Sequence, residues 1–574
     1  MTTAPSVAVL GGGIGGMSAA HELTRRGFAV RVFERLQVPG GKARSMYVPD
    51  TGTDGRPGLP GEHGFRFFPR FYRHITDTMR HIPVGSGTAF DRLVQASRDM
   101  LARDGRRPFV VPAWFPRSFA DLALMLRDYR SRGNLGLTDA ELDFFGARVW
   151  QLMTSCAERC RGDYERLGWW EYLQADRWSE EYRQLLARGV TRTLVAADPR
   201  TASTQVGGEV LTEVVFASAR PGTSGDRLLD GPTSEVWLEP WLAALRTRGV
   251  DYQTESTVRA IRMAGGRVAG VTIERGGQTV EVTADFYVAA LPVEVMSGLL
   301  SDDMIAADPI LAGIRTLAGD VAWMNGIQYF LRERVPIVNG HVTYISSPWA
   351  LTSISQAQFW TSPLSAWGDG TVRDILSVDI SDWDTPGIAN RRPDGSYLTA
   401  RQCTREKIHA DVWAQITRDV NVDGRVLLRD DMIRDWFLDT DIYRDRDGVH
   451  NREPLLVNKI CRWQLRPDAF TGIPNLFLAS DYVRTNTNLA TMEAANEAAR
   501  RAVNGIIDAS GVRAAPCRIW ALYQPWVLAP LRWHDRRRFA AGLPWTAQPP
   551  LWLRLVFRIA HALGRLLARV RRGG

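Results

Sequence analysis

The sequence VAVLGGGIGGMSAAHELTRRGFAVRVFE, residues 7–34, decides the fold of this chain. Residues 7–10 are a short apolar run typical of a buried parallel strand, and a helix is predicted to begin at about Ile14. Between them, Gly11, Gly13 and Gly16 have GxGxxG spacing, which permits a tight turn, close approach of backbone to a pyrophosphate and close helix–strand packing. Free N–H groups at the helix start would bind the phosphates. The stretch therefore predicts a dinucleotide-binding unit.

An acidic residue completes this unit. The predicted strand 29–33 ends at Glu34, whose carboxylate can accept hydrogen bonds from both hydroxyls of a ribose. Gly40 and Gly41 then precede Lys42 and Arg44, a pattern suited to contacts with a second phosphate, although a simple turn is the alternative. The motif alone does not distinguish FAD from NAD.

Charge is distributed unevenly along the 574 residues. Residues 517–574 contain eleven arginines and one aspartate, a net charge of +10, so the rest of the chain carries −2 of the total of +8. This distribution predicts an anionic partner for the tail and argues against nucleic-acid binding by the body.

The cysteines and the apolar runs indicate a cytoplasmic protein. Five cysteines form no metal-like cluster, so we expect a reducing compartment and no metal site. The first strand begins at Val7, which leaves no room for a cleavable signal peptide, and no apolar run reaches the roughly 18 residues of a spanning helix.

Two blocks of the chain interrupt the nucleotide-binding segments. Residues 76–224 are predicted to be mainly helical, with Thr138 and Glu141 as a capping box and a further amphipathic helical region over 167–190. Residues 301–454 mix strand-like runs with a helix over 405–420. We expect these blocks to form a substrate domain, and residues 1–75, 225–300 and 455–515 to form a discontinuous cofactor domain.

The last of these segments carries a resemblance to a known family. The strand 475–480, Asp481 at its end and the helix predicted over 492–507 resemble the C-terminal FAD signature of the flavin amine oxidase and phytoene desaturase superfamily. The resemblance implies FAD, with Asp481 at the ribityl or pyrophosphate and the helix N-terminus at the N1–C2=O edge of the flavin. A helix N-terminus would stabilise the negative charge of reduced flavin.

This resemblance also implies a fold and a set of cofactor contacts. The fold is α/β: a glutathione-reductase-type Rossmann FAD-binding domain with an inserted α+β substrate domain and a C-terminal amphipathic helical tail. Val258 would contact adenine through its backbone. The implied cofactor-binding residues are Gly11, Gly13, Ile14, Gly15, Gly16, Glu34, Arg35, Gly41, Lys42, Ala43, Arg44, Val258, Asp481 and Met492.

Within the superfamily, GEHGFRFFPRFY (61–72) and the segment 475–495 look most like the plant- and cyanobacterial-type carotenoid desaturases. That likeness implies an FAD-dependent oxidoreductase that moves a hydride from an apolar isoprenoid or polyene to flavin N5, with Arg66, Phe67 and Thr491 as candidate catalytic residues. Arg66 would orient a polar end or the flavin, or would only pair with a carboxylate. Departures from the family pattern leave the exact substrate open; they are Lys42, Arg66, Ala494, Asn496 and Glu497.

Three other functions remain alternatives. Flavin amine oxidases usually have an aromatic residue where Thr491 stands and a substrate-domain lysine, for which only Lys407 is available. A flavin-dependent isomerase and a non-catalytic lipid-binding protein are the other two. Because the chain has one GxGxxG motif and no second one for NAD(P)H, we expect a quinone or oxygen to reoxidise the flavin.

The tail, residues 516–574, is predicted to lie on a membrane. Residues 549–572 carry one helical stripe of basic residues beside a wide apolar face: Arg554, Arg558, His561, Arg565, Arg569 and Arg572. This pattern suits a helix on the anionic inner face of a membrane, and a helix packed on the body is the alternative.

Overall fold

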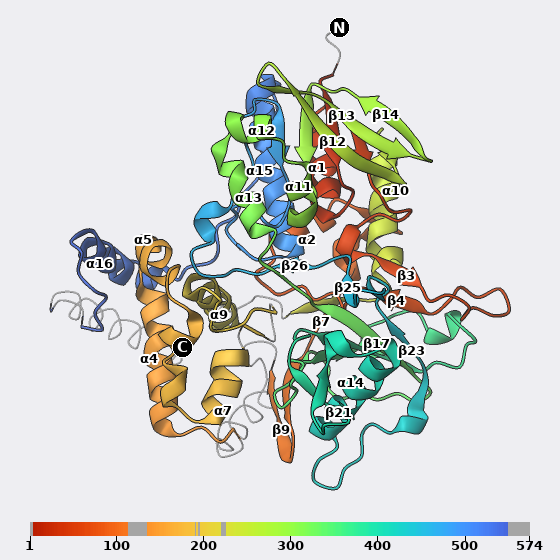
Figure 1. The fold of residues 1–574 in the computed structure, drawn as a ribbon, viewed down its shortest axis with the longest axis vertical. Coiled ribbons are helices and arrows are strands. Elements are labelled where there is room, and N and C mark those ends of the chain that lie inside the picture. Colours follow the sequence, from red (N-terminus) through yellow and green to blue (C-terminus); the bar gives the residue numbers. More distant parts are fainter. Residues whose placement is uncertain are drawn as a thin grey trace, which may run out of the picture.

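The structure is a computed structural model that describes residues 4–112, 135–189, 191–192, 196–219, 226–548 and 551. Two sheets organise these residues, one of five strands and one of seven. In Figure 1, helices α1 (Ile14–Thr24) and α15 (Met492–Ser510) lie in the upper part, and α14 (Arg405–Val420) with the strands around it lies at the lower right. Helices α4 (Asp139–Thr154) and α7 (Glu180–Tyr182) lie at the lower left.

The five-stranded sheet has the order β11-β2-β1-β15-β27, and all its neighbouring strands are parallel. Its strands come from three distant parts of the chain. They are β1 (Ser6–Leu10), β2 (Ala29–Phe33), β11 (Asp251–Gln253), β15 (Phe286–Ala289) and β27 (Leu476–Leu478). Every residue of β15 and β27 is buried, as expected for parallel strands covered on both faces. The α/β prediction for this part of the chain is correct.

Helices α1, α15 and α10 (Glu239–Thr247) pack around this sheet. Helix α15 packs on α1, and the side-chain amide of Asn496 donates a 2.7 Å bond to the hydroxyl of Ser18 on α1. The fully buried Ala498, Ala499 and Ala502 of α15 belong to the core of this sheet. The helix starts at Ile14 and Met492 are those predicted from the sequence. Both helices therefore point their N-termini toward the carboxyl ends of the strands that precede them.

A three-stranded meander follows β11. It consists of β12 (Ser256–Ala264), β13 (Arg267–Arg275) and β14 (Gln278–Val282), joined by turns at residues 265–266 and 276–277. All four turn glycines have positive φ, between 56° and 77°, which is the conformation that two-residue hairpin turns require. The predicted Gly-Gly turns are confirmed.

The seven-stranded sheet has the order β23-β17-β20-β19-β18-β8-β9. Its pairs are antiparallel except for β18 and β8, and α14 packs on it through Ile408, Val412 and Ile416. The strands are β8 (Arg98–Arg103), β9 (Arg106–Pro112), β17 (Asn325–Leu331), β18 (Val342–Tyr344), β19 (Thr352–Ser355), β20 (Asp374–Ile380) and β23 (Ile433–Leu438).

Short elements connect these layers. The helices are α2 (His74–Met79), α5 (Ala157–Arg159), α6 (Trp169–Tyr172), α9 (Thr204–Ala219), α11 (Val293–Leu299), α12 (Asp302–Ala307), α13 (Ala312–Leu317) and α16 (Ala529–Ala540). The strands are β3 (Ser45–Tyr47), β4 (Pro60–Glu62), β5 (Pro83–Val84), β6 (Gly87–Thr88), β7 (Leu93–Gln95), β10 (Arg227–Leu229), β16 (Val321–Ala322), β21 (Pro386–Arg391), β22 (Tyr397–Thr399), β24 (Ile442–Arg444), β25 (Val449–Asn451) and β26 (Leu455–Leu456).

The prediction that residues 76–224 are mainly helical is wrong over 83–112, which form the strands β5 to β9. The turn between β8 and β9 contains Asp104 and Gly105, with φ of +63° at the glycine, a hairpin signal that the prediction overlooked. The capping box of Thr138 and Glu141 does begin α4 as predicted. The helix predicted over 167–190 is broken at Gln174, whose φ is +49°.

Two predicted domain boundaries need correction. Met304, Leu311 and Leu317, on and between α12 and α13, belong to the same core as the five-stranded sheet, so the boundary near residue 300 lies after α13. Ile75 and Ala89 belong to that core too, so the boundary near residue 75 lies further along the chain. Apolar residues in these short segments complete the cover of the first sheet, which local sequence patterns do not reveal.

The first part of the predicted tail is packed on the body. Cys517 is buried in the core of the first sheet, and the backbone N–H of Trp520 donates a 2.9 Å hydrogen bond to Nε2 of His74. Helix α16 is held by Asp535, which accepts bonds from the N–H of Cys156 and the guanidinium of Arg159. The helix predicted over 549–572 lies outside the described residues, apart from residue 551.

Candidate functional site

The carboxyl ends of β1, β2, β15 and β27 open onto one cleft, whose empty volume is about 1200 Å³ with its mouth included. In open parallel sheets, ligands bind at this edge. The predicted residues that line the cleft are Gly11, Gly13, Ile14, Gly15, Glu34, Arg35, Gly41, Lys42, Ala43, Arg66, Val258, Asp481, Thr491 and Met492. The predicted residues outside its lining are Gly16, Arg44 and Phe67.

Glycines shape the inner wall of this cleft. Gly11 has φ of +97°, and a Cβ atom on it would lie 2.4 Å from the carbonyl oxygen of Ala290. A Cβ atom on Gly16 would lie 1.9 Å from the carbonyl oxygen of Gly11, so Gly16 serves helix–strand packing and does not face the cleft. A Cβ atom on Gly13 would meet nothing closer than Cα of Gly41, at 3.7 Å. The space before Gly13 is therefore open to a pyrophosphate at the start of α1.

The glycine pair Gly40–Gly41 packs directly on the glycine turn at residues 11–13. The N–H of Gly40 donates a 3.0 Å bond to the carbonyl of Gly12, and Gly13 and Gly40 form a parallel bridge. The φ values of Gly40 and Gly41 are +100° and +55°, so the tight turn requires glycine at both positions. Residues 11–13 and 40–41 thus form one continuous glycine surface along the cleft.

Glu34 is tied to the glycine turn. Its carboxylate accepts hydrogen bonds of 2.7 Å from the N–H of Gly12 and 2.9 Å from the N–H of Leu36. Burial raises the pKa of the Glu34 carboxyl, while these two N–H groups oppose the shift. A carboxylate has about four acceptor positions, so Glu34 keeps acceptor capacity at the cleft wall for the ribose hydroxyls that its position predicts.

The predicted cationic residues differ in their surroundings. Lys42 and Arg35 line the cleft, where Lys42 bonds the carbonyl of Pro454 and Arg35 bonds Glu453. Arg44 instead turns away, because its guanidinium donates a 2.6 Å bond to Asp441 and a 2.9 Å bond to the carbonyl of Gly41. Arg44 therefore does not line the cleft and bonds the glycine turn from behind, and its direct cofactor contact stays a prediction.

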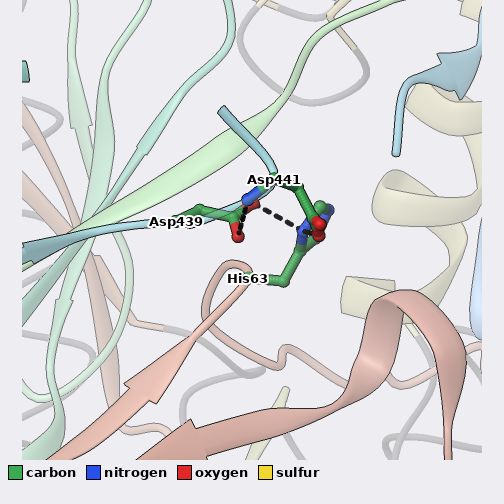
Figure 2. A group of neighbouring side chains, drawn as sticks. All are labelled: His63, Asp439 and Asp441. Carbon is green, nitrogen blue, oxygen red and sulfur yellow. Dashed lines mark hydrogen bonds and ion pairs between the residues drawn. The ribbon is translucent and has the colours of Figure 1, made fainter. Parts of the chain in front are cut away.

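Arg44 pairs with a buried cluster of three charged or polar side chains, His63, Asp439 and Asp441. Figure 2 shows these three side chains. Nδ1 of His63 lies 2.7 Å from Asp439 and 3.5 Å from Asp441. Burial lowers the pKa of His63, but the two aspartates outweigh it and raise the pKa overall. The three ligand atoms lie within 4.8 Å of one another, close enough to hold a cation. Since Arg44 and Asn325 already donate to the aspartates, we interpret the cluster as an ion-pair network beneath the cleft.

The opposite wall of the cleft comes from the C-terminal signature. Asp481 follows β27, and Thr491 caps α15 by accepting a 3.2 Å bond from the N–H of Ala494. Gly15 meets this wall directly, since a Cβ atom on it would lie 1.9 Å from the carbonyl oxygen of Ala479. The start of α15 is therefore brought to the glycine turn, as the resemblance implies for a flavin between them.

Arg66 is the one candidate catalytic side chain with charge. It lines the cleft, donates a 3.1 Å bond to the carbonyl of Lys42 and lies 4.0 Å from Glu62. Burial lowers the pKa of Arg66, and the carboxylates of Glu62 and Asp379 oppose this shift. The position of Arg66 beside Glu62 agrees with the predicted pairing to a carboxylate, and its role toward the flavin or a polar substrate end stays a prediction. Phe67 packs instead against the ring of His341, with centroids 5.4 Å apart.

Two glutamates of α15 hold the site together: Glu493, which the sequence analysis did not single out, and Glu497, which it named only as a departure from the family pattern. The carboxylate of Glu493 accepts bonds from the N–H groups of Arg73, His74 and Ile75, so it caps α2. Glu497 accepts 2.9 and 3.1 Å bonds from the N–H of Asn486 and thereby fixes the loop before Thr491. Two acidic residues at i and i+4 on the inner face of a helix were a visible signal of such a role.

A second cavity, which we call the apolar chamber, adjoins the cleft at the carboxyl ends of the strands, which we call the flavin cleft. The two cavities share Leu455, Ala490 and Thr491 in their linings. The empty volume of the apolar chamber is about 560 Å³ with the open space at its mouth included. Helix α9 forms one wall of it with Val206, Gly207 and Val210. The rest of the lining is Thr191, Ala197, Ala202, Met324, Leu456, Val457, Asn458 and Leu489. Hydrocarbon surface predominates, which fits a ligand that brings few polar groups.

The chain is similar to known proteins over most of its length. It is 25% identical to the carotenoid phi-ring synthase of Streptomyces griseus over 89% of both chains. It is 25% identical to the 15-cis-phytoene desaturase of Synechococcus elongatus, over 85% of this chain and 93% of that protein. It is 27% identical to the hydroxysqualene dehydroxylase of Rhodopseudomonas palustris, over 88% and 99%.

Solved structures show the same fold at lower identity. Putrescine oxidase aligns with a TM-score of 0.59 at 12% identity, over 88% of this chain and 99% of that one. Cyclohexylamine oxidase from Brevibacterium oxydans aligns with a TM-score of 0.57 at 14% identity, over 89% and 100%. The family model described as flavin containing amine oxidoreductase matches residues 14–318. The chain therefore belongs to the flavin-containing amine oxidoreductase family and is an FAD-dependent oxidoreductase of the amine oxidase and phytoene desaturase superfamily.

Proposed function

We propose that this protein is a desaturase-type oxidoreductase whose substrate is a long apolar isoprenoid or polyene. The apolar chamber that opens beside Thr491 onto the flavin cleft supports this proposal most strongly. Relatives named as phytoene and zeta-carotene desaturases add support. When bound, FAD supplies a hydride acceptor at its N5 atom.

The residues of the chain supply position and surroundings. Val206 and Val210 hold a hydrocarbon chain and exclude water, so that an allylic C–H bond is presented beside Thr491. The N-terminus of α15 faces the cleft at Met492, where its dipole favours the negative charge of a reduced flavin. Arg66 fixes the position of the Lys42 carbonyl and adds positive charge to the same wall.

Two features argue against an amine oxidase. At the position where those enzymes usually carry an aromatic residue, Thr491 caps α15 and leaves the entrance to the chamber without a ring. Lys407 lies exposed on α14, on the side of the molecule occupied by the seven-stranded sheet, and does not line the cleft or the chamber. The other two lysines of the chain are Lys42 and Lys459, which pair with Glu294 and Asp320.

Anaerobic bleaching of the flavin tests the proposal. We expect yellow protein whose flavin absorbance is lost on addition of phytoene in detergent micelles and returns with a soluble quinone or with oxygen. Bleaching by amines, with peroxide formed in air, and none by phytoene would show an amine oxidase. Conversion of phytoene to an isomer on pre-reduced protein, with no net bleaching, would show an isomerase; bound phytoene that never reacts would show a binding protein.

We also propose that the protein docks on the inner, anionic face of the cytoplasmic membrane. No helix among the described residues is long and apolar enough to cross a bilayer. The described part of the tail exposes Trp526 (80% exposed) and Trp533 (43%) beside Arg536 and Arg537, which suits an anionic, interfacial surface. Exchange of Arg554, Arg558, Arg565 and Arg569 for glutamine in the full chain should abolish sedimentation with anionic liposomes; unchanged sedimentation would contradict the predicted role of 549–572.

A further inference from the structure

The first part of the tail is hydrogen-bonded to residues that hold the flavin cleft together. The N–H of Trp520 donates a 2.9 Å bond to Nε2 of His74 on α2, and its carbonyl accepts a 2.8 Å bond from the side-chain amide of Asn486. Nδ1 of His74 lies 2.7 Å from Glu493, and the N–H of Asn486 donates a 2.9 Å bond to Glu497. Both connections therefore end on carboxylates near the start of α15, the helix that begins in the lining of the flavin cleft.

These bonds determine the protonation state of the His74 ring. A backbone N–H can only donate, so Nε2 of His74 carries no proton while it accepts from Trp520. The ring proton is therefore on Nδ1, where it is donated to Glu493. His74 must be neutral to hold Trp520 in this way, and a second proton can bind only at Nε2. Protonation would turn this acceptor into a donor that faces the N–H of Trp520.

The two sides of the His74 ring differ in charge. Carboxylate oxygens of Glu493 and Glu497 lie 2.7 and 3.9 Å from Nδ1, where they can pair with an imidazolium. On the other side, the centroid of the Trp520 ring lies between 5.1 and 5.4 Å from the guanidinium carbons of three arginines. A positive charge on His74 would therefore be held by α15 and repelled from the surroundings of Trp520. The charged groups around His74 and Trp520 are Glu22, Arg73, Asp77, Glu493, Glu497, Arg500, Arg501 and Arg518.

We propose that His74 is a pH-sensitive latch between the tail and the flavin site. Neutral His74 keeps the latch closed, and Trp520 then holds residues 518–525 on α2 and on Asn486. Acid opens the latch, because the released state binds one proton more at His74 than the closed state. Residues 518–525 contain no helix or strand that would keep them in place, whereas Cys517 before them stays bonded to Asn504. The inference goes beyond the proposed function and does not depend on the substrate.

Hydrogen exchange of the FAD-loaded full chain, read by mass spectrometry between about pH 8 and about pH 5.5, tests the latch. The rates are expressed as protection relative to unstructured peptides at the same pH. Residues 518–525 should lose at least about tenfold of their protection in acid, because the N–H of Trp520 loses its acceptor. Residues 529–540 of α16, which Asp535 holds, should change by less than about twofold over the same range.

Variants of His74 separate this residue from other titrating groups. His74→Gln keeps an acceptor oxygen and does not titrate, so the protection of residues 518–525 should stay constant across the range. His74→Leu has no acceptor and should leave these residues unprotected at both ends of it. The matched control is His450→Gln, which removes an exposed histidine paired with Asp445 and should follow the wild type.

Several outcomes would overturn the inference. Unchanged protection of residues 518–525 in the wild type at low pH would do so without any variant. An equal loss in His74→Gln would assign the effect to another group, and full protection in His74→Leu at about pH 8 would show that the bond to Trp520 holds nothing. Residues 484–491 should lose protection together with the tail, and a loop that keeps it would disprove the link to the flavin site. Flavin content and the midpoint of thermal unfolding show that each measured protein is folded.

Discussion

The backbone of Gly15 lies against the carbonyl oxygen of Ala479, so close that a Cβ atom on Gly15 would be 1.9 Å from that oxygen. This contact joins the first turn of α1 to the end of β27, two segments from opposite ends of the body. It places Asp481 and Thr491 across the cleft from the glycine turn. The cofactor site therefore exists only where these two segments meet.

Two glycine variants should separate packing from cofactor binding. Gly15→Ala should destabilise the fold by about 1–3 kcal/mol or more, because the new methyl group displaces backbone. Gly13→Ala should leave the stability of the FAD-free protein within about 1 kcal/mol, since its Cβ position is free of protein atoms, and should abolish FAD binding. Thermal unfolding of FAD-free protein and flavin absorbance after reconstitution measure the two effects. Equal loss of stability in both variants would contradict this assignment.

The cap of α15 gives a second prediction. Thr491→Ala removes the oxygen that accepts the N–H of Ala494, which should cost about 0.5–2 kcal/mol of unfolding free energy. Thr491→Ser keeps the oxygen and should stay within a few tenths of the wild type. Denaturant unfolding of the three proteins provides the comparison. A serine variant as unstable as the alanine variant would show that the methyl group of Thr491 carries the effect instead.

Two glutamates of α9, Glu209 and Glu213, predict a pH-dependent stability. In the folded state the pKa of Glu213 is raised to about 8 and that of Glu209 to about 7, above the unfolded value of 4.5. Arg161 and the buried Arg466 act on Glu209 as positive charges, and Glu165 acts on it as a negative one. Because the folded pKa values are raised, this contribution to stability is fully present below about pH 4.5 and is lost as the pH rises through about 7 to 8.

Glutamine cannot ionise, so Glu213→Gln should match the wild type near pH 5 and exceed it above pH 8. A shift of three to four pH units corresponds to at most about 4–5 kcal/mol, with about 1–2 kcal/mol expected once the folded state relaxes around the charge. Unfolding midpoints across this pH range measure the difference. A constant offset between the two proteins would contradict the raised pKa.

Attachment of α16 depends on a buried ion pair. Arg159 lies 2.9 Å from Asp535, and both side chains are 3% exposed. Asp535→Ala leaves the guanidinium without its main partner, which should cost about 3–5 kcal/mol and expose the amides of residues 529–540 to hydrogen exchange.

The matched control is Glu158→Gln, which removes the exposed pair with Arg536 and should cost no more than about 1 kcal/mol. Hydrogen exchange read by mass spectrometry distinguishes the two variants. If residues 529–540 were equally protected from hydrogen exchange in the wild type and in Asp535→Ala, α16 would be held by its apolar contacts alone.

The cofactor unit was predictable because its requirements are local. The turn at Gly11, the start of α1 at Ile14 and the strand that ends before Glu34 follow from residues a few positions apart. The same holds for the Gly-Gly turns of the meander and the capping box at Thr138. A short sequence pattern fixes such features, since the backbone conformation and the hydrogen bonds it needs are formed within the segment itself.

The sequence did not predict the strands over 83–112 or the two shifted domain boundaries, because these features depend on contacts between distant parts of the chain. Strand β8 pairs with β18, more than two hundred residues later in the chain, and α13 packs on the core of a sheet that begins at Ser6. No local window contains both partners of such a contact. The predicted membrane helix over 549–572 lies outside the described residues and stays a prediction.

The sequence by itself determined a nucleotide-binding fold and its cofactor, because glycines, a strand-end acid and a helix start impose their geometry wherever they occur together. Only the tertiary structure decided which side chains line the cleft and which are paired or buried elsewhere. Arg44 pairs with Asp441 and does not line the cleft, Phe67 packs on His341, and Glu213 is buried on α9 with no ion pair to any residue that the structure describes. Burial and electrostatic pairing depend on segments hundreds of residues away, and these meet only when the chain has folded.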